Sequence, residues 1–118
     1  MLNINKVEHV YLAVGTTDLR KSIDGLSAIV HSIFKMGIHE SSVFVFCNRN
    51  RDKVKILHWD NGFWLYYYRV EKGRLKWPLE ENRDTTVDIN IEEFSWLLKG
   101  YEVRIHNKLS INNDKKMY

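Results

Sequence analysis

The chain of 118 residues has few cysteines, prolines and glycines and no long apolar run, and each of these features excludes a class of protein. Its one cysteine, Cys47, excludes an internal disulfide and a metal site built from thiolates alone. No apolar run approaches the roughly 20 residues that cross a bilayer, and the first residues lack the apolar stretch of a signal peptide. With one proline, six glycines and 44% hydrophobic residues, the chain is neither linker-rich nor disordered. We therefore expect a small soluble, cytoplasmic protein that does not bind membranes.

The positive charge of the chain is concentrated in its middle quarter. The net charge is only +3, yet residues 49–76 hold eight basic and three acidic residues. Such a block is typical of a surface that binds a polyanion. The alternative is a solvated strand face whose basic side chains prevent edge pairing. On the first interpretation, the DNA-binding residues are Arg49, Arg51, Lys53, Lys55, Arg69, Arg74 and Lys76.

Apolar residues recur at helical spacing in two segments. The first predicts a helix from Asp18 to about Lys35. Asp18 would lie near the positive end of the helix dipole, and Gly37 would end the helix. Gly25 in the middle of this helix indicates a close backbone approach, which a packed sheet would explain. The second predicts a helix over residues 91–99 that stops at Gly100.

Between these helices the apolar period changes to two. Residues 43–48, 53–59, 63–70 and 74–77 read as strands joined by short turns rich in Asn, Asp and Gly, which favours an antiparallel meander. Residues 10–14 form a further short β-prone segment, and residues 85–90 are extended or capping. A three-residue loop with Gly62 at positive φ would pair Trp59 with Phe63, Lys55 with Tyr67 and Lys53 with Arg69.

This register divides the side chains between two faces. One face gathers the basic residues with Trp59 and Tyr67, which could stack on nucleic-acid bases. The other face, with Trp64, Tyr66 and Tyr68, packs against the helices, and core packing is the alternative for most of the rings. The resulting fold is a single α+β domain over residues 1–106. It has a four- or five-stranded antiparallel meander, two helices on one face, and a flexible tail at residues 107–118.

The sequence gives little support to catalysis. Its aspartates form no spacing that singles out a metal pair, and its five histidines are scattered without a zinc-binding motif. The glycines are too far apart for a phosphate-binding loop. We therefore predict no catalytic residue, no metal and no cofactor.

Two motifs carry a family resemblance. Residues 18–26 read D-x-R-K-S-x-D-G-L, and residues 74–78 read R-x-x-W-P, with matching strand segments between them. In this order they resemble the TnpB accessory proteins that are encoded beside the transposase in bacterial insertion sequences of family sixty-six. The resemblance spans about residues 10–100 and implies a role in transposition, without catalytic residues.

As an accessory factor in transposition, the protein is expected to bind DNA, the transposase of the same element, or both. The leading hypothesis is DNA binding through the basic strands. The alternative is an adaptor that contacts the transposase without touching DNA, through the aromatic and basic face or the first helix. For that helix the candidate contact residues are Arg20, Lys21 and Asp24.

Overall fold

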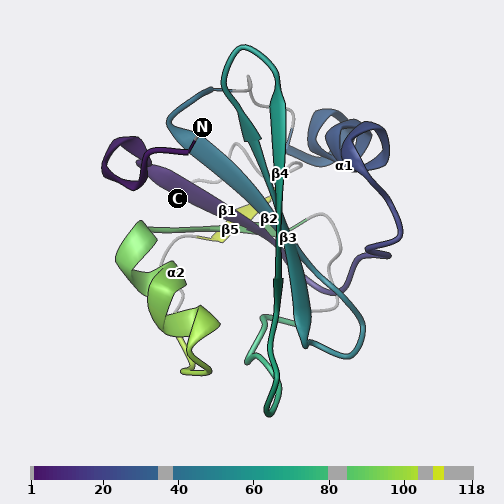
Figure 1. The fold of residues 1–118 in the computed structure, drawn as a ribbon, viewed down its shortest axis with the longest axis vertical. Coiled ribbons are helices and arrows are strands. Elements are labelled where there is room, and N and C mark those ends of the chain that lie inside the picture. The colour runs from purple at the N-terminus through teal and green to yellow at the C-terminus, as the bar shows by residue number, and fades with distance from the viewer. Residues whose placement is uncertain (1, 35–38, 80–84, 104–107, 111–118) are drawn as a thin grey trace.

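A mixed six-stranded sheet organises the chain, with the strand order β4-β3-β2-β1-β5-β6. The computed structural model describes residues 2–34, 39–79, 85–103 and 108–110. The strands are β1 (His9–Ala13), β2 (Ser42–Cys47), β3 (Lys53–Trp59), β4 (Phe63–Arg69), β5 (Thr85–Ile89) and β6 (Lys108–Ser110). The helices are a 3-10 turn η1 (Ile4–Lys6), α1 (Ile23–Ile29) with a π-helical extension η2 (Val30–Phe34), and α2 (Ile91–Leu98) (Figure 1).

The first two hairpins of the predicted meander are confirmed. Strands β2, β3 and β4 run antiparallel in chain order, and the β3–β4 register pairs Lys53 with Arg69, Lys55 with Tyr67 and Trp59 with Phe63, as predicted. The loop differs in one detail. Asn61, not Gly62, takes the positive φ of 61°, because the short side chain of Asn tolerates the left-handed region.

The prediction of a purely antiparallel sheet is wrong at its centre. β1 pairs with β2 in parallel, with His9 opposite Ser42, while β5 pairs antiparallel with the other edge of β1. The physical reason is α1, which lies between β1 and β2 in the chain. A helical crossover returns the chain to the same end of the sheet, so the two strands it joins run in parallel.

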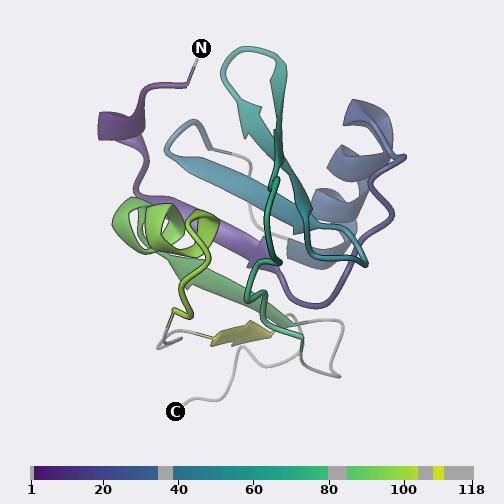
Figure 2. The ribbon, with the colours of Figure 1, turned by 60° about the horizontal axis from the view of Figure 1, so that its bottom comes forward.

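The prediction that both helices share one face is also wrong. α2 contributes Phe94 and Leu97 to a core that covers one face of the sheet, and α1 contributes Leu26 to a second core on the opposite face. Figure 2 shows the two helices on either side of the strands. Because both faces are covered, β2 is buried at every position, whereas the edge strand β4 has no fully buried residue. Trp64 and Tyr68 of β4, predicted to be core, are 42% and 39% exposed.

Residues 74–77 do not form the predicted fourth strand. Leu75 and Trp77 nevertheless fill the core on the α2 face, at 1% and 4% exposure. The Leu75 amide donates to the Arg51 carbonyl oxygen at 2.7 Å, and the Trp77 indole Nε1 donates to the Ala13 carbonyl oxygen at 3.0 Å. The period of two therefore reports burial on one side of an extended segment that turns away from β4.

The first helix begins later than predicted. α1 starts at Ile23 after the N-cap residue Ser22, and Asp18 lies in the preceding loop instead of capping the helix. A Cβ atom at Gly25 would lie 3.0 Å from Cβ of Lys21, so the close approach comes from that loop and not from a packed sheet. The predicted end at Gly37 lies outside the described residues.

The second helix agrees with its prediction. A capping box fixes its start, since Asn90 Oδ1 accepts from the Glu93 amide and the Glu93 carboxylate accepts from the Asn90 amide. Gly100, at φ +97°, follows its end. Residues 108–110, predicted to belong to a flexible tail, pair with β5 as β6. Among the described residues, no helix combines the length and apolarity needed to cross a membrane.

Candidate nucleic-acid interface

A basic groove of about 740 Å³ lies at the end of the sheet where β1 and β2 finish. Three parts of the chain form its walls: the loop between β1 and α1, the turn between β2 and β3, and the neighbouring strands β3 and β4. Four cations and one carboxylate belong to the lining, which consists of Thr16, Thr17, Asp18, Leu19, Arg20, Asn48, Arg49, Asn50, Lys53, Lys55 and Tyr67. The groove thus combines an excess of positive charge with one aromatic ring.

The β1–α1 loop is tied to the sheet and organised by Asp18. The Thr17 amide donates to the Cys47 carbonyl oxygen at 2.7 Å, which joins the loop to the end of β2. The Asp18 carboxylate accepts a hydrogen bond from the Arg20 amide at 3.0 Å. It also accepts two hydrogen bonds from the Arg20 guanidinium, from Nε to Oδ1 at 3.0 Å and from Nη2 to Oδ2 at 2.7 Å. These bonds hold the pKa of Asp18 well below its usual 3.8. The pair fixes the guanidinium at the mouth of the groove.

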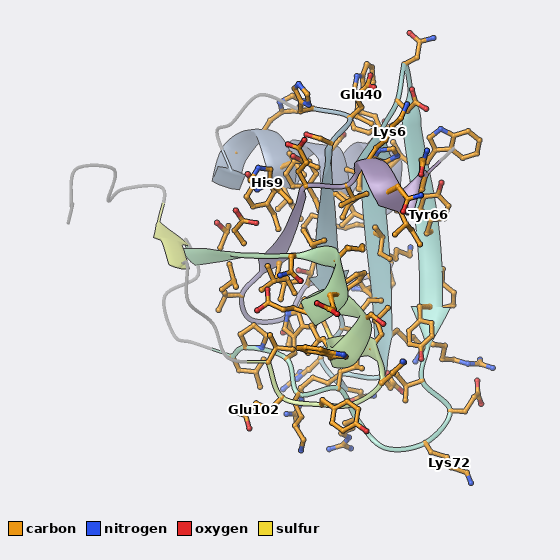
Figure 3. All side chains as sticks on the ribbon, turned by 90° about the vertical axis from the view of Figure 1, so that its left-hand side faces the viewer. Lys6, His9, Glu40, Tyr66, Lys72 and Glu102 are labelled. Carbon is orange, nitrogen blue, oxygen red and sulfur yellow. The ribbon has the colours of Figure 1, made fainter. Side chains whose placement is uncertain are left out.

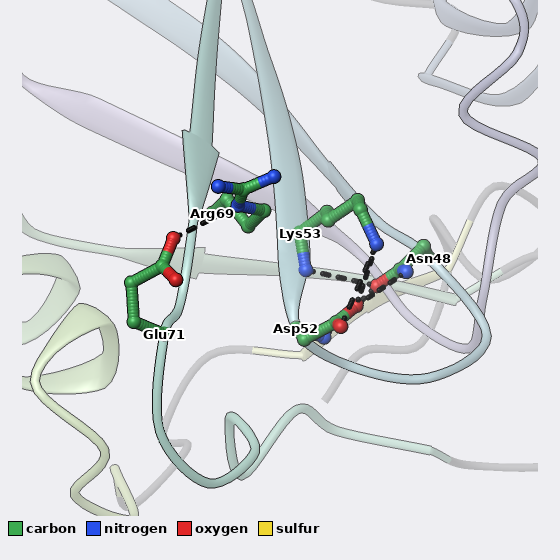
Figure 4. A network of polar contacts seen from close by, with 5 residues as sticks. All are labelled: Asn48, Asp52, Lys53, Arg69 and Glu71. Atoms are coloured by element: carbon green, nitrogen blue, oxygen red, sulfur yellow. Dashed lines mark hydrogen bonds and ion pairs between the residues drawn. The ribbon is translucent and has the colours of Figure 1, made fainter.

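Asn48 organises the turn on the opposite wall. Its Oδ1 accepts from the amides of Asp52 and Lys53, both at 3.0 Å, and its Nδ2 donates to the Asp52 carboxylate at 2.7 Å (Figure 4). The last of these bonds lowers the pKa of Asp52. Lys53 Nζ lies 3.4 Å from the same carboxylate, so its charge is partly compensated. Within the described residues, the exposed Arg49 has no ion-pair partner, which leaves its guanidinium available for a ligand.

Lys55 and Tyr67 form the floor, side by side on β3 and β4. Lys55 Nζ donates to the Lys21 carbonyl oxygen at 2.9 Å, a contact that places the ammonium under the loop without neutralising it. Tyr67 is 55% exposed. Gly25 permits this arrangement. A Cβ atom at position 25 would crowd the side chain of Lys21, and the carbonyl oxygen of Lys21 accepts the hydrogen bond from Lys55 Nζ. The first three residues of the D-x-R-K-S-x-D-G-L motif therefore line one wall of the groove.

The structure brings together only part of the predicted DNA-binding set. Arg49, Lys53 and Lys55 line the groove with Tyr67, one of the two stacking candidates. Arg69 lies one step along the same face of β4, but its Nε donates to Glu71 at 2.9 Å (Figure 4). Trp59, the other stacking candidate, lies at the far end of β3 and packs edge-on against Phe63.

Other predicted residues lie elsewhere. Arg51 and Lys76 line a separate cavity of about 420 Å³ with Trp77 and Leu97, a residue of the α2 core. Arg74 is exposed in the segment that follows β4. The proposed partner surface also divides, since Arg20 joins the groove while Asp24 is exposed on the first turn of α1. Lys21 meets the groove only through its carbonyl oxygen.

Sequence reasoning missed the polar residues that complete the groove. The sequence pattern instead indicates helix N-cap oxygens for Thr16, Thr17 and Asp18, a turn for Asn50 and the end of a strand for Asn48. The one available signal was the spacing of Asp18 and Arg20, since an Asp side chain often bonds to the backbone two residues on. The approach of this loop to the β2–β3 turn depends on the parallel pairing of β1 with β2, which the sequence did not predict.

The part of the chain that the structure describes offers neither a cluster of metal ligands nor a reactive thiol. There, no group of three His, Cys, Asp or Glu side chains is arranged to hold a metal ion. The thiol of Cys47 is fully buried, and this burial raises its pKa to about 12. A thiol in that state is not a nucleophile at neutral pH.

Acid titration tests the Asp18–Arg20 pair. A carboxyl whose pKa is lowered by folding stabilises the protein above its usual pKa, and the effect is lost as the pH falls through the lowered value. We expect the Asp18 carboxylate signal in NMR spectra to titrate well below 3.8, and to return toward 3.8 in Arg20→Ala. Equal titration of Asp18 in the two proteins would show that the pair does not form.

Comparison with known proteins assigns the chain to a family. The family model described as "IS66 Orf2 like protein" matches residues 8–108, which include both walls and the floor of the groove. The chain belongs to the IS66 Orf2-like family. The family implies a transposition-associated accessory function. The resemblance stated from the two motifs is thereby confirmed.

Two relatives come from Sinorhizobium fredii. The protein described as "Uncharacterized protein y4hO" is 30% identical over 105 residues, which cover 88% of this chain and 90% of the relative. A second, "Uncharacterized protein y4jC", is 26% identical over 103 residues, 86% of each chain. No solved structure gives a significant match.

Proposed function

We propose that this IS66 Orf2-like protein binds DNA through the basic groove, as a non-catalytic accessory factor in transposition. The observation that supports this best is the gathering of Arg20, Arg49, Lys53 and Lys55 around the exposed ring of Tyr67. Cations at this density neutralise neighbouring phosphates, and a ring at the floor of a groove can stack on a base. Catalysis has no comparable support, since the groove holds a single carboxylate, which is already bound to Arg20.

The salt dependence of binding tests this proposal. If three or four cations contact phosphates, the affinity for mixed-sequence DNA should fall about 40- to 150-fold between 50 and 200 mM salt, because bound phosphates release counterions. Fluorescence anisotropy with a labelled oligonucleotide gives both the affinity and the slope. Absence of binding at 50 mM salt would refute the proposal.

The second candidate is an adaptor that contacts the transposase without binding DNA. It is favoured by exposed rings at the end of α2, where Trp96 and Tyr101 are 48% and 62% exposed. The Tyr101 amide donates to the Trp96 carbonyl oxygen at 3.1 Å, which keeps the two residues together. Binding to purified transposase that is lost in the variant Trp96→Ala, Tyr101→Ala, without any binding to DNA, would favour this candidate.

A further inference from the structure

The outer edge of β4 is open for pairing. β4 is the last strand of the sheet, and in the described part of the chain nothing pairs with its outer edge. Figure 3 shows it at the border of the molecule. The Val70 amide donates to the Asp52 carbonyl oxygen, and the Asp60 amide donates to the Gly62 carbonyl oxygen. The backbone groups of the even-numbered residues of β4 therefore form the hydrogen bonds to β3. Phe63, Leu65, Tyr67 and Arg69 therefore point their backbone N–H and C=O groups outward.

This edge lacks the features by which sheets usually prevent association. β4 is seven residues long, contains no proline, and carries a single charge, Arg69, at its last position. Inward-pointing lysines, prolines and very short edge strands are the common protective devices. Strand β6 at the opposite edge has three residues within the described part of the chain. The sheet therefore has one edge that is well suited to accept another strand.

The sequence of β4 is complementary to itself when reversed. If two copies meet antiparallel with Tyr66 opposite Tyr66, Phe63 lies opposite Arg69 and Leu65 lies opposite Tyr67. Each residue with outward-pointing N–H and C=O groups then faces another such residue, as a hydrogen-bonded antiparallel pair requires. On the α2 face, Trp64 then lies opposite Tyr68. Aromatic cross-strand pairs stabilise sheets, and an arginine over a phenyl ring is attracted to it.

The charges beyond the strand agree with this register. The same alignment places Asp60, in the β3–β4 loop, opposite Lys72, in the turn after β4. Figure 3 shows Lys72 at the tip of that turn, far from Tyr66 along the strand direction. Opposite charges thus meet at both ends of the pairing, and no like charges face each other over residues 60–72. Charge complementarity of this kind fixes the register of a pairing.

We propose that two copies of this chain associate through β4, edge to edge, with a two-fold axis at Tyr66. The axis is perpendicular to the sheet, because pairing within one sheet reverses the strand direction and keeps the faces. The two basic grooves then open on the same face of a continuous sheet. The association itself does not depend on DNA, so its test is independent of the proposed function.

Cysteine cross-linking tests both the association and its register. Tyr66→Cys places thiols opposite each other in a non-hydrogen-bonded pair, with Cα atoms about 4.5 Å apart, which a disulfide can span. The matched control is Trp64→Cys, on the same strand and face, where the two thiols lie about 13 Å apart along the strand. Because Cys47 is buried, the introduced thiol is the reporter. We expect Tyr66→Cys to form a covalent dimer at least about tenfold faster under mild oxidation.

A backbone variant tests the edge without relying on a disulfide. Tyr67 directs its N–H outward, so Tyr67→Pro removes an edge donor while keeping the bonds to β3, and Tyr67→Ala keeps that donor. We expect light scattering to give a dimer mass for wild type and Tyr67→Ala, and a monomer mass for Tyr67→Pro. Circular dichroism of each variant confirms the fold. A monomeric wild type at 100 μM and above (roughly the range of weak association), or equal cross-linking at positions 66 and 64, would overturn the proposal.

Discussion

Removing three cations of the groove, in the variant Arg49→Ala, Lys53→Ala, Lys55→Ala, should weaken DNA binding about 100- to 1,000-fold at 0.1 M salt. Each lost phosphate contact costs nearly one logarithmic unit at this salt concentration, and reduces the salt slope by about one. The fold should survive, since the three side chains are exposed or half-buried and none belongs to either core. Anisotropy titrations at several salt concentrations measure both effects.

A matched variant separates the groove from net charge. Lys72→Ala, Arg74→Ala, Lys76→Ala removes the same charge from three exposed residues that do not line the groove. We expect this variant to lose less than about tenfold in affinity, through the weaker long-range field alone. Equal losses in the two variants would show that DNA responds to overall charge and not to the groove.

Trp77→Ala should destabilise the fold by about 3–5 kcal/mol, because it deletes a large ring from the core and leaves an acceptor without its donor. Trp77 is 4% exposed and its Nε1 bonds to the carbonyl oxygen of Ala13, the last residue of β1. For a domain of this size the melting temperature should fall by roughly 10–20 °C. Thermal denaturation followed by circular dichroism measures the shift.

Trp96→Ala is the control for this loss. Trp96 is 48% exposed on α2, so its removal should change stability by less than about 1 kcal/mol. The comparison also bears on the groove, since β1 leads directly into the loop that carries Asp18 and Arg20. A Trp77→Ala protein as stable as Trp96→Ala would contradict the packing of residues 74–78 against β1.

Local patterns in the sequence were enough to predict the β2–β3 and β3–β4 hairpins. The alternation in residues 43–70 and the turn at Asp60, Asn61 and Gly62 specify both the strands and their register, because a slip by one residue would bury lysines. The second helix was equally predictable, since Asn90 and Glu93 are local capping signals. These features depend on residues that are close in sequence.

The non-local parts could not be predicted in this way. An amphipathic helix shows that one side is buried, but not which face of the sheet buries it, so α1 and α2 were placed together. The period of two at Leu75 and Trp77 reports burial and not hydrogen bonding to β4. An alternating pattern alone cannot distinguish a strand from an extended segment that crosses a core.

The same limits apply to the groove. Charge density singled out residues 49–76 as a block. The structure places Arg49, Asn50, Lys53, Lys55 and Tyr67 of this block in the lining of the groove, together with Asn48. Charge density could not show that Arg51 and Lys76 line the cavity on the α2 face, nor that Asp18 and Arg20 reach the groove from the β1–α1 loop. That juxtaposition follows from the parallel pairing of β1 and β2 and the bond from Thr17 to Cys47.

Mapping the DNA contact by NMR tests the central claim most directly. Amide chemical shifts of the wild-type protein, followed during titration with a short DNA, report on every part of the surface at once. The account predicts that the largest changes fall on residues 16–20, 48–55 and 67, and that the amides of Trp96 and Tyr101 stay unchanged. Changes centred on α2, or spread evenly over the exposed lysines and arginines, would contradict it.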